Sequence, residues 1–178
     1  MTVQINDFVQ CENKDYEVVS FSDPLSFSPV EYGITPKGFS TICFRGYMCE
    51  YLISNEEIVL KNFYINCEND VYPEINGVVP VIEKDYVLFK GYHYYEGVNI
   101  KISYTGKILV GKDLISKYIV PCKFQEGFVY RKLYEVVFDK GIRVDVKDRS
   151  KEAKKLRKTI EENQNINWCN LPRITDWY

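Results

Sequence analysis

The 178-residue sequence contains a single histidine, His93, and that scarcity limits the reactions it can support near neutral pH. Histidine is the side chain whose charge ordinarily changes between about pH 5 and 8, and a Ser-His-Asp or Cys-His site would need it. His93 stands in the run Tyr92-His93-Tyr94-Tyr95, where strand alternation predicts a packed or surface position. The sequence therefore predicts no catalytic residue.

Closely spaced cysteine pairs are also missing. Six cysteines are present but no CxxC pair, and the nearest two, Cys43 and Cys49, have five residues between them. Structural zinc sites favour closer ligand pairs, and disulfide scaffolds are shorter and richer in cysteine. We therefore expect no metal, no cofactor and reduced thiols. Cys43, Cys67 and Cys122 lie in apolar surroundings, where free cysteine packs as a small hydrophobe.

Long hydrophobic runs and targeting signals are absent as well. No apolar stretch approaches the roughly 18 residues of a membrane span. The first residues lack the basic start and apolar run of a secretory signal, and no Asn-x-Ser/Thr acceptor occurs. These absences predict a cytoplasmic protein without a membrane partner.

The chain has no large excess of either charge, since its net charge is −2. The charged residues are, however, unevenly distributed along the sequence. Residues 1–70 carry a net charge of −7 and residues 71–178 carry +5. A nucleic-acid partner is not expected, because such domains usually have a strong basic excess. An acidic surface can instead steer a basic protein partner. The predicted contact residues are Asp15, Glu17, Glu56 and Glu57.

What the chain does contain is a period-two pattern rich in aromatic residues, which make up 15% of it. Residues 39–53 and 57–65 predict a hairpin with a bulge at Gly46, and residues 85–95 predict a strand interrupted at Gly91. Residues 128–138 and 142–146 predict a second hairpin. Because about nine strands exceed one ordinary sheet, we expect a mainly β domain, a two-layer antiparallel sandwich or a partly open barrel.

One helix is predicted at about residues 150–163, with Ala153, Leu156 and Ile160 on one face. Lysines and arginines surround this face, and a basic amphipathic helix can bind a membrane surface or a partner. The apolar face is narrow, however, and we expect it to dock on the sheet. The tail over residues 164–178 contains both tryptophans, and we expect it to dock on the body. Residues 1–178 are thus predicted to form one domain.

The run from Gly106 to Asp113 nearly matches a phosphate-binding loop of the GxxxxGK[ST] type. Asp113 replaces the hydroxyl that would bind magnesium, and Ile108-Leu109-Val110 is typical of a strand. No long helix follows. We interpret this run as a strand.

The main functional hypothesis is a non-catalytic protein-binding protein. Alternatively, Tyr92, His93, Tyr94 and Glu96 form a site for a small ligand such as a sugar or nucleotide, because aromatic rings stack on both. A small hydrolase using Glu50 and Glu96 as paired carboxylates is a further form of that alternative. Self-association through exposed strand edges stays open too.

Two stretches resemble a known group of proteins. Residues 38–51, Gly-Phe-Ser-Thr-Ile-Cys-Phe-Arg-Gly-Tyr-Met-Cys-Glu-Tyr, followed by Ile58-Val-Leu, are similar to a pattern in small uncharacterised bacterial β-rich proteins. Residues 102–114 resemble the same group. The resemblance implies an accessory protein, in its most specific form an immunity protein that occludes the active site of a bacterial toxin. It brings no catalytic motif.

Overall fold

The computed structural model describes residues 3–25, 27–38, 40–121 and 123–163, and their main regular secondary structure is strand. The strands are β1 (Phe8–Cys11), β2 (Lys14–Phe21), β3 (Tyr47–Ser54), β4 (Glu57–Ile65), β5 (Val81–Ile82), β6 (His93–Tyr95), β7 (Ile100–Lys101), β8 (Gly106–Leu114), β9 (Tyr130–Asp139) and β10 (Ile142–Asp148). Helix α1 spans Ser150–Glu162, and four 3-10 turns are η1 (Pro29–Tyr32), η2 (Val87–Phe89), η3 (Ser116–Tyr118) and η4 (Gly127–Val129).

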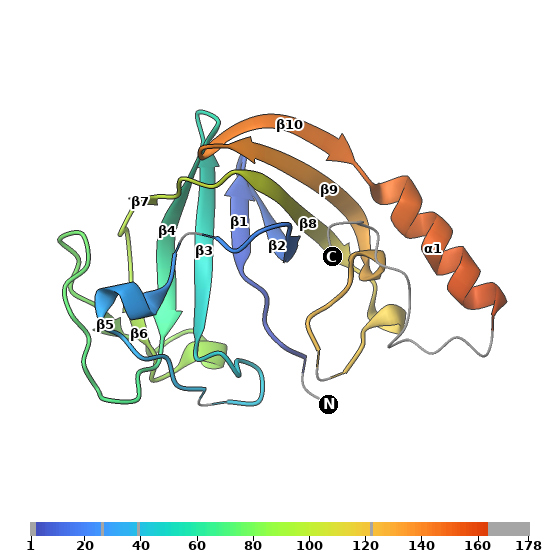
Figure 1. Cartoon of the computed structure of the whole chain (residues 1–178). Coiled ribbons are helices and arrows are strands. Elements are labelled where there is room, and N and C mark those ends of the chain that lie inside the picture. Colours follow the sequence, from blue (N-terminus) through green and yellow to red (C-terminus); the bar gives the residue numbers. More distant parts are fainter. Residues whose placement is uncertain (1–2, 26, 39, 122, 164–178) are drawn as a thin grey trace.

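The ten described strands form one strongly curved mixed sheet in the order β10-β9-β8-β2-β1-β3-β4-β6-β5, with β7 beside β4 (Figure 1). In this strand order, β1 and β3 form the single parallel pair, and the other neighbouring strands are antiparallel. The last strand, β10, also meets β4 at Ile142 and Glu57, so the path from β4 to β10 closes into a strand ring. The strand ring is not a barrel, and this final contact rests on one residue pair.

The main core lies on the concave side of the sheet. Val9 of β1, Leu60 of β4, Ile108 of β8 and Phe138 of β9 belong to one buried cluster there. A second cluster lies under α1, where Ala153 and Ile160 are buried against β9 and η4. Burial of these apolar faces is the main favourable contribution to folding. The predicted mainly β fold with one C-terminal helix is confirmed.

Helix α1 packs through the predicted residues, with Leu156 partly buried beside Ala153 and Ile160. Arg157, one of the charged residues around that face, is buried and donates hydrogen bonds of 2.7 Å to the carbonyls of Phe128 and Tyr130. Those carbonyls belong to η4 and the start of β9, so Arg157 anchors the helix to the sheet. The predicted docking of residues 164–178 lies outside the described residues.

Both predicted hairpins are present, with Asn55-Glu56 turning β3 into β4 and Lys140-Gly141 turning β9 into β10. Two predicted strand starts are wrong. Strand β3 begins at Tyr47, not at residue 39, because Gly46 has a φ of +80° and packs directly on the backbone of Lys37. Residues 85–92 contain the turn η2, so only the last three residues of that predicted strand pair in the sheet. The run from Gly106 onward is strand β8, which excludes a phosphate-binding loop.

Candidate functional site

The four predicted acidic contact residues lie in two separate places. Glu17 points away from the concave side, and its carboxylate accepts hydrogen bonds from the Tyr130 hydroxyl at 2.7 Å and from the Asn6 amide at 3.1 Å. Asp15 is exposed and accepts from the Gln10 amide. At the β3–β4 turn, the other two acidic residues are paired with cations.

The cations at that turn come from neighbouring strands. Arg143 of β10 donates two hydrogen bonds to Glu56, at 2.5 Å and 2.8 Å, and Lys101 of β7 lies 3.0 Å from Glu57. Much of the charge that the sequence offers at these positions is therefore engaged within the chain. A contact role for the four carboxylates stays a prediction.

The alternative ligand residues do not converge on one cavity. Tyr92 is buried in a small aromatic cluster against Phe89, and Tyr94 stacks on Tyr64 with ring centroids 4.3 Å apart. His93, on the opposite face of β6, stacks on Tyr72. Glu96 is exposed beyond the strand end. The tyrosines of this segment serve mainly as packing residues.

The stack of His93 on Tyr72 predicts a pH dependence. The ring centroids are 3.4 Å apart, and Nδ1 of His93 is buried with no hydrogen-bond partner among the described residues. Burial lowers the pKa of His93, partly offset by the nearby Asp70 carboxylate. The unfolded chain therefore binds this proton more readily, and stability is lost as the pH falls through the range below about 6.5.

Urea unfolding between pH 7.5 and 5 tests this dependence. We expect the free energy of unfolding to fall toward the lower pH in the wild type and to change much less in His93→Gln. Because the chain has one histidine, this substitution removes the one side chain whose ordinary pKa lies in that range. Equal slopes in both proteins would contradict the prediction.

A surface that the sequence did not single out lies at the last described strand of the sheet, β5. Residues 79–88, called here the edge segment, contain six large apolar side chains exposed to solvent: Val79, Val81, Ile82, Tyr86, Val87 and Leu88. Val87 is 83% exposed and Val79 is 68% exposed. Isolated exposed apolar residues are normal, but six of them within ten residues of the chain indicate a candidate interaction surface.

Among the described residues, no strand pairs with the outer side of β5 in the edge segment. Val81 pairs with Tyr94, and the N–H of Glu83 donates to the carbonyl of Tyr92 at 2.8 Å. Since inward and outward hydrogen-bonding groups alternate along an antiparallel strand, the N–H and C=O of Ile82 point away from β6. An unpaired strand edge of this kind is a template for a further strand.

The charge beside this edge is mainly negative. Residues 66–96 contain six acidic residues and two lysines. The Glu83 carboxylate accepts the backbone N–H groups of Tyr86 and Asp85, and these hydrogen bonds lower the pKa of Glu83. Glu83 therefore remains ionised at the edge over the whole neutral range.

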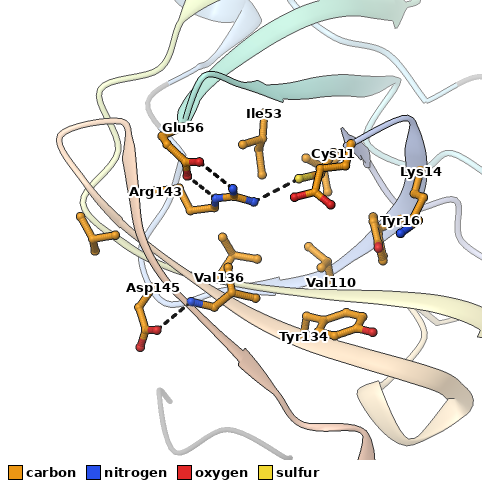
Figure 2. A pocket seen from close by; sticks show the side chains of 14 residues that line it. Cys11, Lys14, Tyr16, Ile53, Glu56, Val110, Tyr134, Val136, Arg143 and Asp145 are labelled. Carbon is orange, nitrogen blue, oxygen red and sulfur yellow. Dashed lines mark hydrogen bonds and ion pairs between the residues drawn. The ribbon is translucent and has the colours of Figure 1, made fainter.

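A pocket of about 450 Å³ opens on the concave side of the strand ring (Figure 2). Its walls come from β1, β2, β8, β9 and β10 and from the ends of the β1–β2 and β3–β4 hairpins. Val110 and Val136 lie deep in it, and the rings of Tyr16 and Tyr134 meet edge to face at 5.9 Å. We call this space the inner pocket.

Arg143 crosses the upper part of the inner pocket (Figure 2). Besides its bonds to Glu56, its Nη1 donates to the sulfur of Cys11 at 3.2 Å. Burial raises the pKa of the Cys11 thiol despite that guanidinium, so the thiol is protonated at neutral pH. A protonated thiol is a weak nucleophile, and Cys11 is placed to bind rather than to react.

The described residues contain no group of three or more His, Cys, Asp or Glu side chains placed to hold a metal ion. Cys11, Cys43, Cys49 and Cys67 are free thiols, and the last three are buried. No helix in the described part of the chain is long and apolar enough to cross a membrane.

Sequence reasoning missed both the edge segment and the inner pocket. Of the edge segment, only residues 85–88 fall within a predicted strand, although the run Val78-Val79-Pro80-Val81-Ile82 is also strongly apolar. The inner pocket offers no such signal, since Cys11 and Tyr16 come from the β1–β2 hairpin, whereas Tyr134 and Arg143 come from the β9–β10 hairpin far along the sequence.

Comparison of the chain with protein-family models, curated proteins and solved structures found no match. The interpretation of both surfaces therefore depends on their own geometry.

Proposed function

We propose that this chain is a non-catalytic cytoplasmic protein that binds a basic protein partner at the open edge of β5. The exposed apolar set of the edge segment carries the proposal. Exposed side chains of this kind gain free energy when a partner removes them from water, by about 25 cal/mol per Å² of apolar surface.

The geometry of the edge favours a partner that adds an extended segment as a further strand. Val81 and Ile82 point to opposite faces of the sheet, and both are exposed. An added strand places side chains against both faces at once, while Ile82 supplies the backbone hydrogen bonds. An edge that is apolar on both faces matches this mode of binding.

The negative charge around the edge segment favours a partner with positive charge. Glu83 and Asp85 lie within the edge segment, and the flanking residues add further carboxylates. A basic partner is attracted by this field and approaches faster at low salt. A toxin whose active site is occluded by this contact is the specific form of the proposal, in line with the resemblance of residues 38–51 and 102–114.

The test compares edge variants with a matched control in capture experiments from the cells that produce the protein. Ile82→Pro removes the outward N–H but leaves the β6 pairing intact, and Val87→Asp places a charge in the apolar set. Val30→Asp is the control, because Val30 is 63% exposed and lies in η1 outside the edge segment.

We expect a basic protein to be captured by the wild type and by Val30→Asp but not by the two edge variants. With that partner purified, each edge substitution should weaken binding at least about tenfold, which corresponds to about 1.4 kcal/mol. Capture by all four proteins alike, or by none, would contradict the proposal. A wild-type dimer that Ile82→Pro dissociates would instead assign the edge to self-association.

A further inference from the structure

The geometry points to a second binding site, independent of the edge segment: the inner pocket is a site for a small, uncharged molecule with an apolar body and a carbonyl-type oxygen. Its volume of about 450 Å³ lies in the usual range for small-molecule sites. The ligand class follows from the walls, from the Arg143 donor that Glu56 holds in place and from the balance of charges.

The walls of the inner pocket suit an apolar body. Val9, Ile53, Val110 and Val136 form its deep part, and each is a branched aliphatic side chain. Val144 and Val146 of β10 also line it, yet they are 59% and 46% exposed. A ligand in the pocket would remove both from water, which is a favourable contribution to binding.

One hydrogen-bond donor in the inner pocket is held in place but poorly used. Glu56 accepts from Nε and Nη2 of Arg143 and so fixes the plane of the guanidinium. The remaining nitrogen, Nη1, donates to the Cys11 sulfur at 3.2 Å. A thiol sulfur is a weak acceptor, so a ligand oxygen that replaces it makes a stronger hydrogen bond.

The charges that line the pocket favour a neutral oxygen over a carboxylate. Three carboxylates, on Glu12, Glu56 and Asp145, face two cations, on Lys14 and Arg143. Because Glu56 already neutralises Arg143, an anionic ligand would meet a net negative lining. A cationic ammonium group has no acceptor to offer Nη1 of Arg143. An amide or ketone oxygen accepts a hydrogen bond and carries no net charge.

Three probes of one size test this inference on the full-length chain: octanamide, octanoate and octylammonium. Methyl NMR spectra of the isotope-labelled protein report binding at Val9, Ile53, Val110 and Val136. We expect saturable shifts of these methyl groups with octanamide and at least tenfold weaker binding of the two charged probes.

A variant that fills the mouth of the pocket locates the site without disturbing the core. Val144→Phe adds an aromatic ring at an exposed position that lines the pocket, whereas Val30→Phe adds the same ring outside it. Octanamide should bind at least tenfold more weakly to Val144→Phe and equally well to Val30→Phe and wild type.

Three results would overturn the inference. Absence of saturable shifts at the four wall residues removes the site. Tighter binding of octanoate than of octanamide would contradict the inference that the lining charges favour a neutral ligand. Equal binding of octanamide to both phenylalanine variants places the probe elsewhere on the surface. None of these results depends on whether the edge segment binds a protein.

Discussion

Replacing Asp7 by alanine is expected to lower the free energy of unfolding by about 3–5 kcal/mol, the usual effect of removing one partner from a buried ion pair. Asp7 is buried, and its carboxylate accepts two hydrogen bonds from Arg45 and one, of 2.6 Å, from the N–H of Cys49. Removal of the carboxylate leaves a largely buried guanidinium and a buried N–H without their acceptor.

The position of Asp7 explains the size of this effect. It stands directly before β1, and Cys49 lies in β3, the strand that runs parallel to β1. The Nε of Arg45 donates to the carbonyl of Tyr47 at the start of β3. Asp7 thus joins the two strands at the one parallel pairing of the strand ring, and β1 supplies Val9 and Cys11 to the inner pocket.

Chemical denaturation of four proteins tests the role of Asp7. The double variant Asp7→Ala/Arg45→Met should be more stable than Asp7→Ala alone, because it removes the uncompensated charge. Glu57→Ala is the control, since its ion pair with Lys101 is exposed and should contribute no more than about 1 kcal/mol. A loss in Asp7→Ala no larger than in Glu57→Ala would refute the prediction.

Gly111→Ala is expected to destabilise the protein by about 2–3 kcal/mol through overpacking. A Cβ at residue 111 would lie against Cγ and 2.5 Å from Cδ2 of Tyr130, so it would overlap the aromatic ring. Tyr130 is fully buried, and its hydroxyl is held by Glu17 and Asn6, so the ring has no room to retreat.

Thermal unfolding separates overpacking from a general effect of losing a glycine. Gly91→Ala is the matched control, because residue 91 has open space around a Cβ but a φ of +90°. That backbone conformation alone disfavours alanine by about 1–2 kcal/mol. We expect Gly111→Val to lower the melting temperature further than Gly111→Ala. Melting temperatures of both residue 111 variants at or above that of Gly91→Ala would show that the ring moves aside.

Local patterns in the sequence were sufficient for the elements whose contacts are local. The hairpin turns at Asn55-Glu56 and Lys140-Gly141 and the helix with Ala153, Leu156 and Ile160 on its inner face follow from spacing within a few residues. The same patterns failed at residues 39–46, where a β-rich composition is overridden by the close approach of Gly46 to the Lys37 backbone. Nine residues separate those two positions, and no propensity records their contact.

The charges counted in the sequence show that residues 1–70 are acidic. They do not show which of these carboxylates are left to contact another protein. Glu17, Glu56 and Glu57 look alike in the sequence, yet the fold pairs them with Tyr130, Arg143 and Lys101 from other strands. A carboxylate that already has a partner offers little to a second one. Which acidic residues remain free is therefore decided by strand order.

The sequence by itself determined that the chain is mainly β, ends its described part in a helix and has one histidine to titrate. Only the tertiary structure decided which strand lies at the open edge and which side chains meet in the inner pocket. Strand identity depends on alternation and turns within one segment. Strand order and register depend on contacts between distant segments. Cys11 and Arg143, for example, are 132 positions apart, and local sequence carries no record of that contact.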